Sequence, residues 1–167
     1  MIKVIITGPE CSGKTTLCDN LSKHFNAKKV DEYAREFLNK SNNNYKYNDL
    51  ITIAKNQYKN EKNNYLGKMI FCDTDLITIK IWSDYKYQKC DDWITQKINS
   101  QKKEKRIYIL CKPDLPWEYD PQRKNKDSRD ELFNTYKKEL IKNQCEFFVI
   151  QGKNRFNNTI NYLKNII

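Results

Sequence analysis

Four short runs of the chain are built almost entirely from apolar residues, at positions 2–6, 69–72, 107–111 and 147–150. The apolar residues are consecutive and do not alternate with polar ones, which is typical of strands buried on both faces of a parallel sheet. A weaker strand candidate covers residues 27–30. The pattern predicts a parallel sheet at the centre of the molecule.

The segments between these runs carry apolar residues at helical spacing, three or four positions apart. The groups with this spacing are Leu17, Leu21 and Phe25; Leu50, Ile53, Ala54 and Tyr58; Leu76, Ile77, Ile79, Ile81 and Ser83; Leu132, Phe133, Tyr136 and Leu140; and Phe156, Ile160, Leu163 and Ile167. The third group is apolar on more than one side of its helix. Strands that alternate with helices predict an α/β fold with helices on both faces of the sheet. Ligands of such folds bind at the carboxyl ends of the strands.

The first predicted strand is followed directly by residues 8–15, GPECSGKT, which match the pattern Gly-x-x-x-x-Gly-Lys-Thr. The backbone N–H groups and the helix N-terminus of such a loop attract phosphate, and Gly8 and Gly13 let the backbone approach the phosphate oxygens closely. Lys14 would contact the β- and γ-phosphates, and the Thr15 hydroxyl would ligate Mg²⁺. An ordinary strand–turn–helix with a surface lysine is the alternative. The fixed letters in this context favour a nucleoside triphosphate site.

Acidic residues follow two other predicted strands. Asp73 and Asp75 come after the second apolar run, where a carboxylate beside the phosphate loop is the usual second partner of Mg²⁺. Asp75 fits the N-cap of the next helix equally well. Glu32 and Arg35 follow the weaker strand candidate and form either an ion pair on a helix surface or contacts to an acceptor substrate. The sequence leaves these alternatives open.

Prolines at positions 113, 116 and 121 mark a long irregular segment, residues 113–129, which we interpret as a lid. Arginine is rare in this lysine-rich chain, so Arg123 and Arg129 in the lid indicate planar, bidentate phosphate contacts. Such arginines can stabilise a transferring phosphoryl group and exclude water, and Lys124 and Lys126 add positive charge. A solvated loop without a catalytic role is the alternative.

Arg155 and the tryptophans are weaker candidates for the site. Arg155 lies near the start of the last predicted helix and either flanks an adenine or caps the preceding strand. Trp82, Trp93 and Trp117 invite a stacking role, although core packing is the commoner use of tryptophan. Trp117 lies in the predicted lid, where core packing explains it least.

Length and composition limit the classes of protein to which the chain can belong. A chain of 167 residues is expected to form one domain, residues 1–167, that needs no disulfide or metal to fold. Its six cysteines match no zinc pattern and are expected to be reduced, with Cys11 filling a variable loop position. No apolar run can span a bilayer, and the first residues form a strand and not a signal peptide. We therefore expect a cytoplasmic protein without a membrane partner.

The net charge of +10 raises the alternative of nucleic-acid binding. The lysines are spread along the chain and do not form an arginine-rich stripe, so we expect no nucleic-acid partner. Their charge favours phosphorylated ligands in general.

Taken together, the motifs resemble the ribosylnicotinamide kinase domain of NadR-type proteins. The resemblance rests on GPECSGKTTL, DEYAREFL, YNDLITIAKNQ, FCDTDLITIKIWS, YILCKPDLPWEYDPQR and SRDELFNTYKKEL, in this order over nearly the whole chain. It implies a three-layer P-loop kinase fold, with a parallel five-stranded sheet of order 2-3-1-4-5, helices on both faces and a lid. It also implies that ATP, with Mg²⁺, phosphorylates the 5′-hydroxyl of nicotinamide riboside to give nicotinamide mononucleotide for NAD synthesis.

The resemblance assigns roles to individual residues. The nucleotide site would contain Gly8, Glu10, Cys11, Ser12, Gly13, Lys14, Thr15, Thr16 and Arg155. The riboside site would contain Glu32, Tyr33, Arg35, Asp75, Trp82 and Trp117. Lys14, Asp73, Glu32, Arg123 and Arg129 would be catalytic, with Thr15 and Asp73 on Mg²⁺. Whether Asp73 or Glu32 is the base stays open. NadR-type proteins often carry a helix-turn-helix and an adenylyltransferase domain ahead of the kinase, and we expect neither before residue 1.

Other functions remain compatible with the phosphate loop. The protein could phosphorylate a deoxynucleoside, a nucleoside monophosphate or a sugar-like acid instead. A nucleic-acid-binding ATPase and a nucleotide-binding regulator without turnover are the alternatives from other classes. The sequence leaves open whether GTP replaces ATP and whether the protein forms a homo-oligomer.

Overall fold

The computed structural model describes residues 1–63, 67–123 and 125–166. Its centre is a five-stranded parallel sheet in the order β2-β3-β1-β4-β5. The strands are β1 (Ile2–Thr7), β2 (Lys28–Val30), β3 (Met69–Asp73), β4 (Lys105–Cys111) and β5 (Glu146–Ile150). The predicted fold class and strand order are therefore confirmed.

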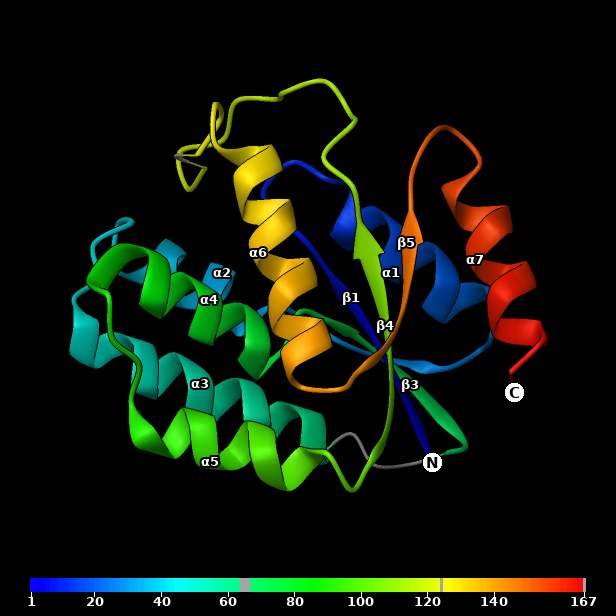
Figure 1. Ribbon diagram of the computed structural model, residues 1–167, viewed down its shortest axis with the longest axis horizontal. Helices are drawn as coiled ribbons and strands as arrows, with labels where there is room; N and C mark the ends of the chain where they lie inside the picture. The colour runs from blue at the N-terminus through cyan, green and yellow to red at the C-terminus, as the bar shows by residue number, and fades with distance from the viewer. Residues whose placement is uncertain (64–66, 124, 167) are drawn as a thin grey trace.

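Helices cover both faces of this sheet. They are α1 (Lys14–His24), α2 (Tyr33–Lys40), α3 (Tyr47–Asn63), α4 (Leu76–Tyr87), α5 (Asp92–Gln101), α6 (Arg129–Lys142) and α7 (Arg155–Lys164). Figure 1 shows α1 and α7 on one face and the helices α2 to α6 on the other. Among the described helices, none combines the length and the apolarity needed to cross a membrane.

Two hydrophobic cores, one on each face of the sheet, explain the continuous apolar runs. In β1, Ile5 packs into the core under α2 to α6, whereas Val4 and Ile6 pack into the core under α1 and α7. Successive side chains of a strand point to opposite faces, so a strand covered on both faces needs apolar residues at consecutive positions. Strand β5 departs from the prediction of burial on both faces. It lies at the edge of the sheet, and Glu146 is exposed while residues 147–149 are half-buried.

The helical spacing predicts α4 well but misses α5. Residues Leu76, Ile77, Ile79 and Ile81 of α4 are all buried, because this helix contacts α3, α5 and α6. In α5 only Ile94, Ile98 and Gln101 are buried, which is too sparse a pattern for the spacing to reveal. The expectations for Ile167 and Lys124 fall outside the described residues.

The segment between β4 and α6 contains no helix or strand among its described residues, as the proline pattern predicts. Figure 1 shows it arching over the same end of the sheet as the loop between β1 and α1. We call residues 113–123 and 125–129 the lid. The carboxyl ends of the strands, the phosphate loop and the lid therefore surround one region of the molecule.

Candidate active site

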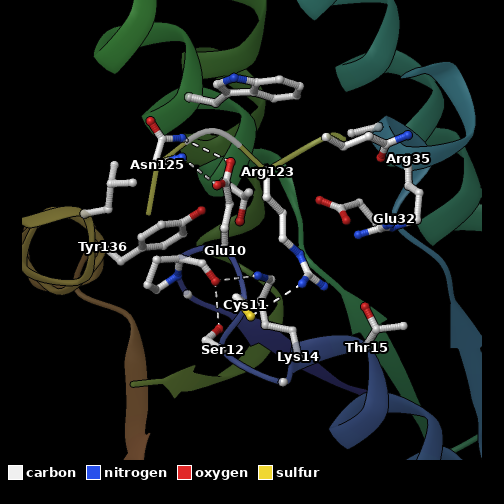
Figure 2. Close-up of a pocket in the computed structure, with 18 of the residues that line it drawn as sticks. Glu10, Cys11, Ser12, Lys14, Thr15, Glu32, Arg35, Arg123, Asn125 and Tyr136 are labelled. Carbon is white, nitrogen blue, oxygen red and sulfur yellow. Dashed lines mark hydrogen bonds between the residues drawn. The ribbon is translucent and has the colours of Figure 1, made fainter. Parts of the chain in front are cut away.

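The loop after β1 is preformed by two glycines and by hydrogen bonds to one carbonyl. The carbonyl oxygen of Pro9 accepts from Ser12 Oγ at 2.7 Å and from Lys14 Nζ at 2.8 Å (Figure 2). Gly13, at the N-cap of α1, has a φ of +76°, which glycine adopts without steric cost. The loop thus presents the N-terminus of α1, with its unpaired N–H groups, toward the cavity above it.

Gly8 is required because the loop passes very close to β4. A Cβ at this position would lie 2.5 Å from the carbonyl oxygen of Cys111, and the φ of +135° disfavours any other residue. We therefore expect Gly8→Ala to lower the free energy of unfolding by about 2–4 kcal/mol. Urea denaturation followed by circular dichroism measures this change.

The matched control for that prediction is Gly152→Ala. Gly152 also has a positive φ, +73°, but a Cβ there would meet nothing within 4 Å. We expect Gly152→Ala to lower the free energy of unfolding by only about 1 kcal/mol, which is the cost of a left-handed backbone conformation for alanine. Equal losses for the two variants would contradict the close contact between Gly8 and β4.

Thr15 and Asp73 meet at the end of β3. Thr15 Oγ1 donates to Asp73 Oδ2 at 2.6 Å, while Asp73 Oδ1 is buried without a hydrogen-bond partner among the described residues. Burial raises the pKa of Asp73, and the hydrogen bond from Thr15 and the charge of Lys14 oppose this. A buried carboxylate oxygen without a partner, beside a hydroxyl, is a suitable ligand pair for Mg²⁺. The two expected metal ligands therefore fit the ion.

A cavity of about 370 Å³ opens above the loop. Most of the residues assigned to the site from the sequence line it: Gly8, Glu10, Cys11, Ser12, Gly13, Lys14, Thr15, Thr16, Glu32, Arg35, Trp82 and Arg123. Figure 2 shows Glu32 and Tyr136 entering it from opposite sides, with Lys14 and Thr15 at its base. The cavity thus has a phosphate end at the loop and a second end between α2, α4 and α6.

Three residues expected at the substrate lie outside the cavity lining: Asp75, Tyr33 and Trp117. Asp75 has no exposed surface; its carboxylate accepts from Ile77 N–H, from Arg106 at 2.9 Å and from Tyr108 Oη at 2.8 Å. It caps α4 and balances a buried arginine, so of the two alternatives the cap holds. Tyr33 donates its N–H to Gln57 and its ring packs against the core.

Three cationic or aromatic candidates support the loops and do not line the cavity. The guanidinium of Arg155 donates to the carbonyls of Ser12, Lys112 and Gly152 and pairs with Asp114. Arg129 donates to the carbonyl of Leu115 at 3.0 Å and lies 5.5 Å from the ring centre of Trp117. The hydrogen bonds of Arg129 and Arg155 support the lid and the phosphate loop. The expected ligand contacts of Arg129, Arg155 and Trp117 stay predictions.

Both carboxylates and cations line the cavity. Burial, and next the charge of Asp73, raise the pKa of Glu32, whereas Lys14 and Arg35 oppose the rise. Glu10 accepts two hydrogen bonds at 3.0 Å from the backbone and the side chain of Asn125 in the lid (Figure 2). The cavity can therefore accept an anion at the loop and a group that pairs with carboxylates at its other end.

Cys11 contacts the lid directly and does more than fill a loop position. Its thiol donates to the carbonyl of Pro116 at 3.3 Å, and its sulfur accepts from Glu118 N–H at 3.2 Å and from Arg123 Nη1 at 3.4 Å. The lid is thus attached to the phosphate loop at Glu10 and at Cys11.

Sequence reasoning missed the apolar wall of the cavity. This wall is formed by Leu38, Ile81, Leu132 and Tyr136, with Thr78 and Tyr85 beside them. The sequence pattern uses Ile81, Leu132 and Tyr136 only to predict helices. Helical spacing indicates which face of a helix is apolar. It does not show whether residues of that face also border a cavity.

Comparisons with known proteins agree with this arrangement. A family model described as AAA domain matches residues 3–156. The trifunctional NAD biosynthesis/regulator protein NadR of Salmonella typhimurium is 29% identical over 152 residues, which cover 86% of this chain and 37% of that protein. The protein of the same name from Escherichia coli strain K12 is 30% identical over 156 residues, covering 89% and 38%. The chain thus spans less than two fifths of these relatives.

A crystal structure of NadR protein in complex with NR has the same fold. It superposes with a TM-score of 0.79 at 18% sequence identity, over 98% of this chain and 50% of that one. These comparisons confirm the resemblance to NadR that the sequence motifs indicate.

Proposed function

The chain belongs to the AAA domain family, and from this premise we propose that it transfers the γ-phosphoryl group of ATP to the 5′-hydroxyl of nicotinamide riboside. The product would be nicotinamide mononucleotide, a precursor of NAD. The observation that carries the proposal is the cavity with two unlike ends. A phosphate loop forms one end, and a half-buried carboxylate, Glu32, faces Tyr136 of the apolar wall at the other.

The phosphate end suits a nucleoside triphosphate. The N-terminus of α1 and the ammonium group of Lys14 would hold the β- and γ-phosphates. Thr15 and Asp73 would hold Mg²⁺, which supplies positive charge to the phosphate oxygens when it is bound. Arg123 lies over the loop, where its planar guanidinium can bind the equatorial oxygens of the transferring group.

The acceptor end suits a cationic aromatic ring. The pyridinium of nicotinamide riboside carries a positive charge, which favours an aromatic face and nearby carboxylates. Trp82 and Tyr136 supply aromatic faces in the cavity lining, and Glu10 and Glu32 supply carboxylates. A carboxylate, either Asp73 or Glu32, would take the proton of the acceptor hydroxyl as the new bond to phosphorus forms.

A product-resolved assay tests this proposal. With ATP and Mg²⁺, we expect nicotinamide riboside to be converted to its 5′-monophosphate with a kcat/KM at least about tenfold above that of neutral nucleosides, because only the cation pairs with the carboxylates. Mass spectrometry identifies the product, and ADP release gives the rate. Faster turnover of a deoxynucleoside or a sugar-like acid would reject nicotinamide riboside as the acceptor while keeping a kinase.

Relatedness to NadR also supports the proposal, at 29 and 30% identity over most of this chain. Because the chain covers only part of those proteins, the proposal is limited to the phosphoryl transfer and extends to neither regulation nor adenylyl transfer.

A further inference from the structure

The lid contains a tight turn at residues 120–123, built around Asp120. The carbonyl of Asp120 accepts from Arg123 N–H at 2.9 Å, and its Oδ1 accepts from Gln122 N–H at 2.9 Å. Aspartate at the first position and proline at the second are the residues that favour such a turn, since the carboxylate binds the backbone two residues on. One oxygen of the carboxylate is therefore committed to the shape of the lid.

The other oxygen of Asp120 faces two arginines that line the cavity. Oδ2 accepts from Arg35 Nη1 at 3.0 Å and lies 3.7 Å from Arg123 Nε. Arg35 belongs to α2, at the acceptor end, and Arg123 Nη1 reaches the phosphate loop at Cys11 Sγ. The Asp120 side chain is 19% exposed and that of Arg35 is 44% exposed, so water screens the pair only from the side of Arg35.

Two guanidinium groups at one cavity need a shared counter-charge. Like charges repel each other, and a carboxylate that contacts both adds two attractions. A second link in the same segment, from Gln122 Nε2 to Asn39 Oδ1 at 2.7 Å, also joins the lid to α2. The lid is thereby attached to α2 at residues 120 and 122 and to the phosphate loop at residues 118, 123 and 125.

We propose that Asp120 is a positioning residue, whose carboxylate holds Arg35 at the acceptor end and Arg123 at the phosphate end in one fixed arrangement. The inference rests on the proposed phosphoryl transfer for its kinetic consequence, but not on the identity of the acceptor. Asp120 touches no substrate. It acts through the two arginines and through the turn that aims Arg123.

The variant Asp120→Asn separates these two functions of the side chain. Asparagine keeps a carbonyl oxygen for Gln122 N–H and therefore keeps the turn, but it puts an uncharged NH₂ donor opposite two guanidinium donors. Asp120→Glu restores the charge with one more methylene. Asp127→Asn is the matched control, because Asp127 is an exposed carboxylate of the same lid with no ion pair to a described residue.

For Asp120→Asn we expect kcat to fall about tenfold to a hundredfold, the size typical of a lost hydrogen bond between charged groups. The KM for ATP should change by less than about threefold, because the phosphate loop is intact. Asp120→Glu should recover part of the loss, and Asp127→Asn should match the wild type. The double variant of Asp120→Asn with Arg35→Gln should lose less than the product of the two single losses, because the bond between Asp120 and Arg35 is removed in both single variants.

Additive losses in the double variant would overturn the proposal, as would a kcat for Asp120→Asn within about twofold of Asp127→Asn. The assay uses whichever acceptor gives turnover, so failure of nicotinamide riboside rejects the proposed function and still leaves Asp120 tested. If no acceptor gives turnover, amide hydrogen exchange of residues 113–123 decides. Faster exchange in Asp120→Asn, restored in Asp120→Glu, supports the proposal, and exchange equal to that of Asp127→Asn overturns it.

Discussion

Replacing Lys14 by alanine is expected to reduce kcat by at least about 10³-fold while the protein stays folded, because the proposed function puts this ammonium group where negative charge would develop on the γ-phosphate. Among the described residues, the side-chain hydrogen bond of Lys14 is the one from Nζ to the carbonyl of Pro9, at 2.8 Å. Little of the fold depends on this bond, so the melting temperature should change by only a few degrees. ADP release with ATP, Mg²⁺ and nicotinamide riboside measures the loss.

Lys23→Ala is the matched control for Lys14→Ala. Lys23 is exposed in the last turn of the same helix, far along it from the phosphate loop, and its removal lowers the net charge equally. This control should keep the rate of the wild type. Wild-type turnover by Lys14→Ala would show that the loop does not hold the reacting phosphates.

Replacing Asp73 by asparagine is the second change with a large expected effect, about 10²-fold or more on kcat. Asparagine can still accept the hydrogen bond from Thr15, but it removes the negative charge expected on Mg²⁺ or on the acceptor hydroxyl. Asp31→Asn is the control, since Asp31 is an exposed carboxylate at the end of the neighbouring strand β2. A loss below about tenfold for Asp73→Asn would argue against either role.

The stability of the Asp73→Asn variant gives an independent readout. Burial raises the pKa of Asp73 in the folded protein, so the folded state favours the protonated form more than the unfolded state does. The free energy of unfolding should therefore decrease as pH rises from about 4, the unfolded pKa, through the raised folded value. Asp73→Asn should lack this contribution and be as stable as the wild type at pH 7 or more so, in the absence of Mg²⁺. Marked destabilisation of Asp73→Asn at pH 7 would contradict the conclusion that burial of the Asp73 carboxylate is unfavourable in the absence of Mg²⁺.

The phosphate loop and the sheet could be predicted from the sequence because both depend on local patterns. The spacing of Gly8, Gly13 and Lys14 is fixed by the shape of one short loop, and consecutive apolar residues follow from two covered faces of each inner strand. Thr15 and Asp73 could be predicted to lie close together because the carboxyl ends of neighbouring parallel strands meet at one edge of the sheet.

The contacts of the lid could not be predicted in the same way. Arg123 and Arg129 are both arginines of one irregular segment, and nothing in their neighbours shows that Arg123 lines the cavity while Arg129 lies at Trp117. The position of Arg123 depends on a partner more than 100 residues away, Cys11, and that of Arg129 on how the irregular lid folds back on Leu115 and Trp117. For the same reason the sequence could not decide between a cap and a substrate contact at Asp75, whose partners Arg106 and Tyr108 lie on β4.

The claim on which the whole account depends is that the turn after β1 binds the phosphates of a nucleotide through main-chain amides. A crystal structure of the protein with ADP and Mg²⁺ tests it most directly. We predict that the β-phosphate lies in the loop of residues 8–15, against the N-terminus of α1 and Lys14. A nucleotide bound elsewhere, with this loop empty, would contradict the account.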